Sequence, residues 1–416
     1  MKANIQYITL FEHQRLKLNQ RIRDVVVDES LINSLERFYG NGLPYYELIH
    51  KGVQFKNYVG VIQIGNTLIE VLPKADKTKN NNNDVNEWRN ILIDMLRSVH
   101  GFEVKAPSSS NLNVRKNSVL DLYFELFLTE TEYLLRKGLV KKYRKTKNNI
   151  TALKGRMLFS KQISKNLVHK ERFFSEYTTY DTEHILHIII YQTLLILKRI
   201  NTNSALTSRI CSLLLNFPEM PIIKINQASF DRIELNRKTN DYRKAIEIAR
   251  LILLHYHPDL SNGRNDVLAL MFDMNLLWEQ FVIVSLRKNK ALNVKGQSKK
   301  YFWKPDGGRK RTIRPDITIS HDEKNYIIDT KWKLVERKPS MDDVRQMYAY
   351  HQYFNAEKVA LLYPGKADYI SGKFVDEIKQ KKLTEMECGL MFTKHNASVR
   401  QWQNEINQQV FKWIKN

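Results

Sequence analysis

The sequence has only two cysteines in 416 residues, Cys211 and Cys388, far apart and in apolar surroundings. Two distant cysteines form neither a disulfide framework nor a zinc-ligand cluster, so we expect buried free thiols in a reducing compartment. No apolar run reaches the roughly 18 residues that span a bilayer. The N-terminus also lacks the apolar stretch of a signal peptide. These absences predict a cytoplasmic protein with no membrane partner.

Nucleotide-binding signatures are absent as well. The chain has no GxxxxGK[ST] loop, and its glycines form no dinucleotide fingerprint. A helical HExxH, the zinc motif of metalloproteases, is also missing. We therefore expect that this chain binds no nucleotide of its own.

Positive charge, in contrast, is in large excess. Lys and Arg number 67 against 44 Asp and Glu, which gives a formal net charge of +23 at pH 7. Such a charge attracts polyanions, of which nucleic acids and anionic membrane surfaces are the commonest in a cell. The ordinary apolar content and the many aromatics predict a folded chain of two or three domains.

The hydrophobic pattern predicts an α+β fold in three regions. Residues 1–84 form a β-rich region, in which Gly65-Asn66 between two apolar runs signals a hairpin and the Asn-rich residues 75–84 form a loop. Residues 85–262 form a helical region, and residues 263–416 a compact α/β domain. In the middle region we expect helices at about 86–99, 119–137, 184–199, 205–216 and 241–257.

The last region alternates between helical and strand-like patterns. An apolar helix is expected at 266–287, and Ser340 is placed to cap a helix that runs to about Phe354. Further expected elements are strands at 298–303, 311–320, 325–333, 358–363 and 386–392, and an amphipathic helix at 397–414.

Three polar residues in this region carry the chemistry. Asp329 and Lys331 are two residues apart in one strand, so their side chains share a face, and a hairpin can bring Asp316 alongside Asp329. Two converging carboxylates repel each other unless a cation neutralises them. Carboxylate oxygens in this number suit Mg²⁺, which keeps waters and phosphate oxygens at its other positions. A lysine beside such a metal can orient an attacking water or stabilise developing charge.

The alternative is an ordinary solvated hairpin, because Asp and Lys are common on exposed strand faces. Asp329, however, follows Tyr326-Ile-Ile inside an apolar strand that we expect to be buried. An unpaired buried carboxylate is costly, so a cation or a partner is expected next to it.

The sequence resembles a known superfamily at these positions. Pro315-Asp316, a short hairpin, Asp329-Thr-Lys331 and then a helix with Gln346 resemble the PD-(D/E)xK nucleases. Other segments are similar, in the same order, to the McrC family, the nuclease subunit of McrBC modification-dependent restriction systems. These are Gly60-Val-Ile-Gln-Ile-Gly65, Ile69-Glu-Val-Leu-Pro-Lys74, Leu153-Lys-Gly-Arg-Met-Leu-Phe159 with Gln162, Asn166, Arg172 and Glu176, and Phe230-Asp-Arg with Asn236 and Tyr242.

The resemblance implies a role for each matching residue. Asp316 and Asp329 match the metal ligands, and with Lys331 they match the catalytic set, with Mg²⁺ or Mn²⁺ as the cofactor. Glu279 matches the acidic residue of the first helix in the superfamily core, and Gln346 the glutamine of the following helix. The alternatives are that Glu279 pairs with an arginine or lies at the helix rim, and that Gln346 faces solvent.

The resemblance also implies partners. These are double-stranded DNA and an McrB-like AAA+ hexamer that reads 5-methylcytosine and hydrolyses GTP, in the cytoplasm of a bacterium or archaeon. McrC proteins engage the pore of this motor with their N-terminal half and stimulate its GTPase, which we extend to residues 1–200, with 1–84 as the expected contact region. The chain departs from the family at Tyr180-Asp-Thr-Glu-His-Ile-Leu, where relatives have an Asn-containing helix start.

Two basic stretches are candidates for DNA contact. The first surrounds the predicted turn at 304–308 and consists of Lys304, Arg309, Lys310, Arg311 and Arg314. It lies just before Asp316, so we expect it to bind phosphates near the cut site. The aromatics among these cations, Tyr301, Phe302 and Trp303, are interpreted as core residues. The second stretch, Arg136 to Lys147, is either a DNA contact or a solvated connector.

Two other functions stay open. One is a stand-alone PD-(D/E)xK nuclease, which shares the chemistry and needs no motor. The other is a non-catalytic DNA-binding scaffold with a decayed site, against which the intact Asp316, Asp329 and Lys331 argue.

Overall fold

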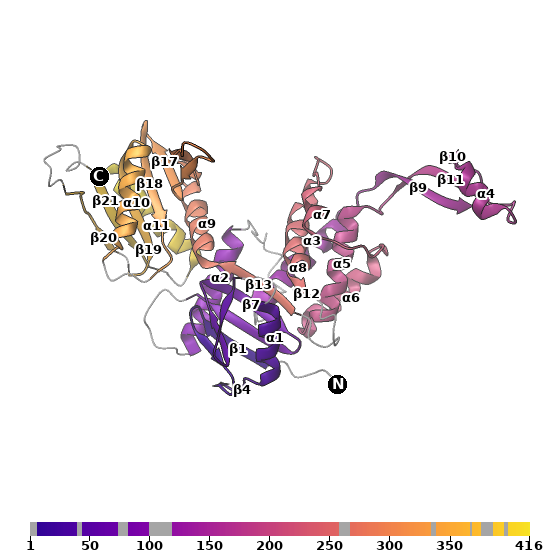
Figure 1. The fold of residues 1–416 in the computed structure, drawn as a ribbon, viewed down its shortest axis with the longest axis horizontal. Helices are drawn as coiled ribbons and strands as arrows, with labels where there is room; N and C mark the ends of the chain where they lie inside the picture. Colours follow the sequence, from indigo (N-terminus) through magenta and orange to yellow (C-terminus); the bar gives the residue numbers. More distant parts are fainter. Residues whose placement is uncertain are drawn as a thin grey trace. The chain divides into compact units, whose positions relative to one another are not determined.

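The computed structural model describes residues 6–39, 44–73, 82–99, 119–257, 267–333, 338–366, 368–375, 386–394 and 398–416 (Figure 1). The chain forms two compact units, and the first is discontinuous in sequence. It joins residues 1–113 to 262–416, while residues 114–261 form the second unit. The α+β class is confirmed. The predicted domain limits at 84 and 262 stay a prediction, and the expected loop at 75–84 lies largely outside the described residues.

The N-terminal part of the first unit is built on a sheet that also uses a strand from much later in the chain. β1 (Gln6–Phe11), β8 (Thr67–Leu72), β7 (Tyr58–Ile64) and β13 (Val267–Asp273) lie side by side in that order. β1 runs parallel to β8, and the other two pairs are antiparallel. The predicted hairpin is confirmed: Ile64 pairs with Thr67, and Gly65 adopts the positive φ of 52° that a tight turn requires.

This N-terminal part also contains a helix that the β-rich prediction missed. α1 (Glu29–Tyr39) buries Leu31, Ile32, Leu35 and Phe38, which recur at helical spacing. The Asp28 carboxylate accepts a hydrogen bond of 2.8 Å from the Leu31 backbone N–H and so caps its first turn. Short strands complete this part: β2 (Arg15–Lys17), β3 (Arg21–Ile22), β4 (Val25–Val26), β5 (Tyr46–Ile49) and β6 (Gly52–Phe55).

The expected helix at 266–287 is partly wrong, because its first part is the strand β13. α9 (Met274–Arg287) begins only after Asp273, whose carboxylate accepts a hydrogen bond of 2.8 Å from the Asn275 backbone N–H. The run from Val267 to Phe272 is apolar at every position. In such a run the spacing of apolar residues cannot distinguish a strand from a helix. Pairing with β7 decides in favour of the strand.

The C-terminal part of the first unit is a mixed sheet with helices on both faces. Its strands lie in the order β14 (Asn293–Gly296), β17 (Ile317–His321), β18 (Lys324–Thr330), β19 (Ala356–Pro364), β21 (Glu387–Thr393) and β20 (Asp368–Ile370). The strands expected at 325–333, 358–363 and 386–392 are confirmed. The one expected at 311–320 is interrupted, because β16 (Arg311–Ile313) ends before Pro315 and β17 starts after it.

One helix covers the face of this sheet that will hold the site. α10 (Met341–Tyr353) starts at Ser340, whose hydroxyl accepts a hydrogen bond of 3.1 Å from the Asp343 backbone N–H, as predicted. Met347 and Tyr350 of α10 pack against Val359 and Leu361 of β19. α9 and α11 (Val399–Lys415) pack against each other and against other strands of the sheet (Figure 1). α2 (Asn82–Val99) packs on α9 and so joins the two parts of the unit.

The second unit is a helical bundle with a projecting arm. Four of the five expected helices are α3 (Val119–Lys137), α5 (Ile185–Ile200), α6 (Ser204–Asn216) and α8 (Arg243–Leu254), which pack on one another. The helix expected at 241–257 ends earlier, at Leu254, and the one expected at 86–99 is α2 of the first unit. This stretch of the chain also contains the short elements α7 (Gln227–Asp231), the 3-10 helix η1 (Asn240–Tyr242) and the strand β12 (Tyr256–His257).

The arm corrects the purely helical prediction for the middle region. β9 (Lys142–Ile150) and β11 (Phe173–Asp181) form an antiparallel ribbon, with β10 (Arg156–Met157) and α4 (Phe159–Asn166) at its far end (Figure 1). β9 has almost no apolar residues, so its sequence lacks the alternation of apolar and polar residues that predicts a strand. Part of the basic stretch from Arg136 to Lys147 is therefore a strand, in which Arg144 pairs with Asp181 at 3.1 Å.

Two expectations from composition have a structural outcome. Both cysteines are free thiols; Cys388 is buried as expected, whereas Cys211 is only half-buried. Among the helices of the described ranges, none is both long and apolar enough to cross a bilayer.

Candidate functional site

The pairing of β17 with β18 brings the two predicted metal ligands together. Ile317 pairs with Ile328, so one step further the antiparallel register sets Asp316 opposite Asp329. One oxygen of the Asp316 carboxylate, Oδ2, accepts hydrogen bonds from the backbone N–H of Thr330 at 2.7 Å and from its hydroxyl at 2.8 Å. These two bonds hold the Asp316 carboxylate against the end of β18.

Asp329 is almost fully buried, with 1% of its surface exposed, as its apolar strand predicts. Its Oδ2 lies 2.7 Å from Lys331 Nζ. Burial and the nearby Asp316 charge raise the pKa of Asp329 to about 7, although Lys331 acts in the opposite direction. A solvated hairpin would leave this carboxylate in water, so burial removes that alternative.

Lys331 is held by three side chains. Besides Asp329, its Nζ lies 3.7 Å from Asp343 Oδ1 and donates a hydrogen bond of 3.3 Å to Gln346 Oε1. Burial works against the charge of Lys331, but the Asp329 and Asp343 carboxylates outweigh it and raise its pKa. The ammonium is therefore charged at neutral pH and fixed in place.

Gln346 is half-buried against the lysine and does not simply face solvent. Its Nε2 donates a hydrogen bond of 2.6 Å to the Tyr350 hydroxyl, which in turn donates one of 2.9 Å to the Arg314 carbonyl. A chain of hydrogen bonds therefore connects Lys331 to the backbone two residues before Asp316.

Glu279 is also at this place, on α9. Its carboxylate is buried and accepts hydrogen bonds of 3.0 and 3.3 Å from Gln297 Nε2. Burial and the charge of Asp316 raise its pKa, while Gln297 and the Arg314 charge lower it. The hydrogen-bond partner is thus a glutamine, where the alternative interpretation expected an arginine.

The sequence pattern did not point to Gln297 or to Asp343. The Gln297 backbone N–H also donates to the Asp316 backbone carbonyl at 2.8 Å, so this residue connects the Glu279 carboxylate to the backbone at Asp316. Asp343 lies in the first turn of α10, and its carboxylate accepts a hydrogen bond of 2.5 Å from Lys333. Burial opposes its charge, but Lys333, Ser340 and Lys331 hold the pKa of Asp343 below its usual range.

The predicted DNA-binding cations Lys304, Arg309, Lys310, Arg311 and Arg314 are all exposed. They lie on or next to a two-stranded ribbon of β15 (Lys300–Trp303) and β16. The expectation that the aromatics beside them are core residues is wrong: Tyr301, Phe302 and Trp303 are 68%, 47% and 56% exposed. A ribbon of only two strands has no sheet or helix to bury both of its faces.

The donor set can be tested against a metal ion. Among the described residues, no three His, Cys, Asp or Glu side chains converge in a way that could hold one. Mg²⁺ does not need three, because it is commonly bound through one or two carboxylates, waters and phosphate oxygens. Apart from its ion pair, the buried Asp329 Oδ2 has no hydrogen-bond partner within the described part of the chain. Asp316 and Asp329 therefore fit Mg²⁺ or Mn²⁺, which stay a prediction.

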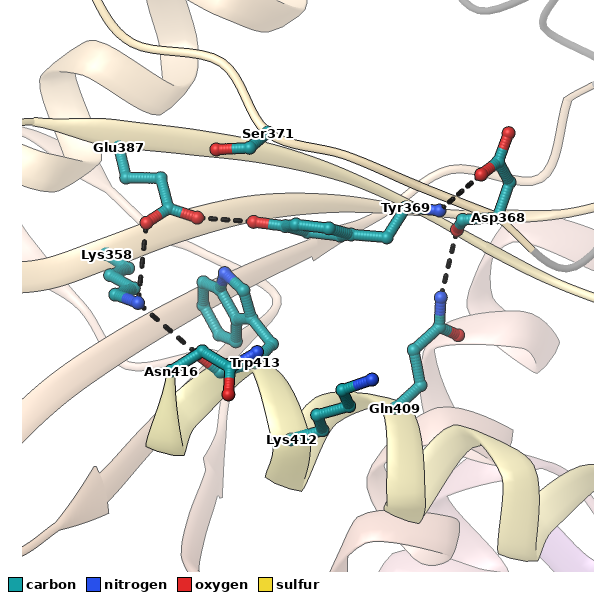
Figure 2. Close-up of a pocket in the computed structure, with 9 residues that line it drawn as sticks. All are labelled: Lys358, Asp368, Tyr369, Ser371, Glu387, Gln409, Lys412, Trp413 and Asn416. Carbon is teal, nitrogen blue, oxygen red and sulfur yellow. Dashed lines mark hydrogen bonds and ion pairs between the residues drawn. The ribbon is translucent and has the colours of Figure 1, made fainter.

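A separate cavity of about 440 Å³ lies between β20, β21 and the end of α11 (Figure 2). Glu387 accepts a hydrogen bond from Tyr369 there and lies 3.4 Å from Lys358 Nζ. Side chains alternate along β19, so Lys358 points to the opposite face from Leu361, which packs against α10. None of the predicted site residues lines this cavity.

The site is tied to the N-terminal sheet through the residue after Lys331. Trp332 Nε1 donates a hydrogen bond of 2.8 Å to Oε1 of Glu12, which directly follows β1. The Trp332 ring lies between Trp88 and Trp278, at centroid distances of 6.4 and 5.6 Å. The end of the strand that carries Asp329 and Lys331 therefore depends on packing against residues from the other end of the chain.

Fold and site together define a class: an α+β protein in which a hairpin of a mixed sheet sets two carboxylates beside a half-buried lysine. The family is shown by its sequence model, which matches residues 53–364. The chain belongs to the family described as McrBC 5-methylcytosine restriction system component.

Individual proteins and solved structures that the chain resembles belong to McrBC systems as well. The chain is 23% identical over 260 residues to the type IV methyl-directed restriction enzyme EcoKMcrBC of Escherichia coli, which covers 59% of this chain and 72% of that protein. Its fold is similar to a chain in the half-complex refined from the tetradecameric assembly of Thermococcus gammatolerans McrB AAA+ hexamers with bound McrC. The TM-score is 0.70 at 20% identity, covering 98% of this chain and 100% of that one. A chain of the Thermococcus gammatolerans McrBC complex gives a TM-score of 0.50 at 21% identity, covering 68% and 88%.

The raised pKa of Asp329 predicts how pH acts on the metal-free protein. The folded state binds the Asp329 proton more tightly than the unfolded chain does, so this group contributes most stability below its unfolded pKa of about 3.9. That contribution is lost as the pH rises towards 7. The asparagine in the variant Asp329→Asn does not titrate, so the variant escapes this loss. In EDTA, the Tm of the variant minus the Tm of the unmodified chain should therefore increase from pH 4 to pH 7, by on the order of 5 °C.

Scanning calorimetry at several pH values measures this difference, and added Mg²⁺ should reduce it by stabilising the unmodified chain. The exposed Asp342→Asn is the matched control and should show no such trend. A Tm difference for Asp329→Asn that is the same at pH 4 and pH 7 would show that Asp329 ionises normally.

The bond between Trp332 and Glu12 predicts a stability change. Trp332→Phe keeps an aromatic ring but removes the N–H, so a buried carboxylate loses a donor. We expect a loss of about 1.5–3 kcal/mol of unfolding free energy, as for hydrogen bonds to charged groups. Urea denaturation followed by tryptophan fluorescence measures it. Glu12→Gln keeps an acceptor and should cost less; equal stability of Trp332→Phe and the unmodified chain would contradict the predicted contribution.

Proposed function

We propose that this chain is the endonuclease subunit of a modification-dependent restriction system and hydrolyses phosphodiester bonds of double-stranded DNA with Mg²⁺ or Mn²⁺. The observation that carries the proposal is the buried Asp329 next to Lys331, with Asp316 directly opposite. These three residues, in this geometry, correspond to the metal-binding and catalytic set of PD-(D/E)xK nucleases, to which we assign the C-terminal part.

The chain's own groups have distinct roles in this reaction. Asp316 and Asp329 would hold the metal, which when bound would polarise a phosphoryl oxygen and make a bound water more acidic. Lys331, fixed by Asp329, Asp343 and Gln346, offers a positive charge to the attacking water or to charge that develops on the phosphate. Glu279 is more easily protonated than an exposed glutamate, because it is buried near Asp316, and can take up a proton there.

The proposed function includes a partner that hydrolyses GTP. One solved relative contains McrB AAA+ hexamers with bound McrC. We propose an McrB-like AAA+ hexamer as the partner of this chain, with no nucleotide bound by the chain itself. Recognition of 5-methylcytosine would then belong to the partner. A system of this kind acts on DNA in the cytoplasm of a bacterium or archaeon.

The arm of the second unit is the best-suited part for this contact. Its far end, around α4, exposes a group of apolar side chains, Leu153, Phe159, Ile163, Leu167 and Val168. Exposed apolar groups that gather at one place on a soluble protein usually mark a binding surface. The arm lies within residues 1–200, where the contact was expected, although outside the β-rich residues 1–84.

Removing the metal ligand tests the catalytic assignment. Asp329→Ala should lower Mg²⁺-dependent cleavage of modified duplex DNA by about 10³-fold or more, because metal binding and the position of Lys331 are both lost. The assay contains the partner and GTP. DNA binding in EDTA should change less than about 3-fold, since the phosphate-binding cations remain.

The outcomes of this experiment separate the candidate functions. Cleavage that persists in Asp329→Ala would contradict the assignment of the site. No cleavage by the unmodified chain under any metal or partner condition would favour the scaffold. Cleavage without GTP or partner would favour a stand-alone nuclease. Asp342→Ala, on the exposed side of α10, is the control and should cut normally.

Polar substitutions at the arm's far end test the partner contact. Phe159→Ser with Ile163→Ser should reduce stimulation of the partner's GTPase by about 10-fold, because the apolar contact is lost. The GTPase rate is measured at increasing concentrations of the chain. The exposed Leu215→Ser on α6 should leave stimulation unchanged. Full stimulation by the double variant would place the contact elsewhere in the chain.

A further inference from the structure

The ribbon of β15 and β16 leaves the fold next to the proposed metal site. On one strand it starts after Gln297, which donates hydrogen bonds to the Glu279 carboxylate and to the Asp316 carbonyl. On the other strand it ends before Arg314, whose carbonyl accepts a hydrogen bond from Tyr350. Both ends are therefore anchored on residues of the site. Since an extended residue spans about 3.3 Å, Trp303 lies within about 20 Å of Gln297.

The ribbon is strongly basic. Residues 298–313 contain six Lys or Arg and one carboxylate, Asp306, which gives a net charge of +5. The carboxylates of the site lie at the base of the ribbon, while the cations Lys304, Arg309, Lys310 and Arg311 lie along it. This charge complements the phosphates of DNA on both sides of a cleaved bond.

The ribbon also exposes aromatic rings that do not form part of a hydrophobic core. Within the described ranges, Phe302 is the ring of the ribbon that packs on another ring, Tyr353 of α10, at 4.9 Å. Tyr301 and Trp303 are more than half exposed, and Lys310 Nζ lies 4.6 Å from the Tyr301 ring centroid. Rings exposed beside lysines and arginines are the combination that binds single-stranded nucleic acid, with cations on the backbone and rings on the bases.

We propose that Tyr301 and Trp303 stack on bases of the DNA next to the cleaved bond, at a place where the duplex is unstacked or kinked. The cations of the ribbon hold the phosphates on either side. The inference rests on the proposed function only in taking DNA as the ligand. It adds that the nuclease part distorts its substrate by itself, independently of how the partner selects the site.

A second copy of this chain is the other occupant that exposed rings suggest. The charge argues against it, because two ribbons of +5 would repel each other, whereas DNA releases bound cations when it meets such a surface. The anchoring at Gln297 and Arg314 also favours DNA over a second copy of the chain. It fixes the ribbon relative to the site, as gripping a substrate requires.

The test measures DNA distortion without cleavage. The full chain binds, in EDTA, a set of short duplexes with 2-aminopurine at successive positions, and fluorescence reports both affinity and unstacking. The unmodified chain should raise 2-aminopurine fluorescence when it binds these duplexes. Tyr301→Ala with Trp303→Ala should abolish that rise and weaken binding by on the order of 10-fold per ring.

A ring outside both candidate DNA-contact stretches supplies the control. Tyr39, at the end of α1, is 37% exposed, and its alanine variant should behave as the unmodified chain does. Tyr301→Leu with Trp303→Leu keeps apolar strand-forming residues without rings and should lose the fluorescence rise as the alanine variant does. It keeps the test decisive if the alanine variant fails to fold.

Three results would overturn the inference. The first is an unchanged fluorescence rise in both ring-deleted variants. The second is a change of oligomeric state in those variants, measured by light scattering, with normal DNA binding; this would assign the rings to a second copy. The third is that the unmodified chain unstacks no base. The proposed function is tested separately by cleavage, so it can hold while the ribbon inference fails.

Discussion

The ion pair between Asp329 and Lys331 is the interaction on which the site depends. A carboxylate that is 99% enclosed in an apolar strand is stable only beside positive charge, and Lys331 supplies it at 2.7 Å. The lysine in turn needs partners for its remaining N–H groups, which α10 supplies through Gln346 and Asp343. The position of α10 on the sheet is therefore coupled to the charge state of one aspartate. A metal ion at Asp329 would share this role with the lysine and leave the ammonium free to act on the substrate.

Three carboxylates lie close together in a protein whose net charge is strongly positive. The first unit gathers Asp316, Asp329 and Glu279 in one place although the whole protein carries +23. A group of carboxylates in a strongly basic protein repels a polyanion locally, although the whole protein attracts it, unless metal ions neutralise the carboxylates. Under the proposed function, DNA binding and DNA cutting would be separable, because cations such as Lys310 and Arg311 would serve the first and the carboxylates the second.

Sequence patterns were most informative where one local rule decides the structure. Alternation along a strand placed Asp329 and Lys331 on one face, and its apolar neighbours predicted the burial of Asp329. The same reasoning failed where partners distant in sequence decide. Val267 to Phe272 became a strand only because β7 was available to pair with it. The rings at 301–303 look like core residues in sequence, but no layer covers their ribbon. Gln297 and Asp343 acquired their roles from hydrogen bonds to residues on other elements, which no spacing rule describes.

The bond from Trp332 to Glu12 also constrains the order in which the protein can become active. Glu12 is synthesised 320 residues before Trp332, and the entire second unit is made between them. At about 5–20 residues per second, the first strand waits some 16–64 s for its partner on the ribosome. During that time the N-terminal sheet also lacks β13. A nascent or truncated chain therefore lacks the contact between Trp332 and Glu12, so the proposed nuclease site would be complete only after most of the chain has emerged.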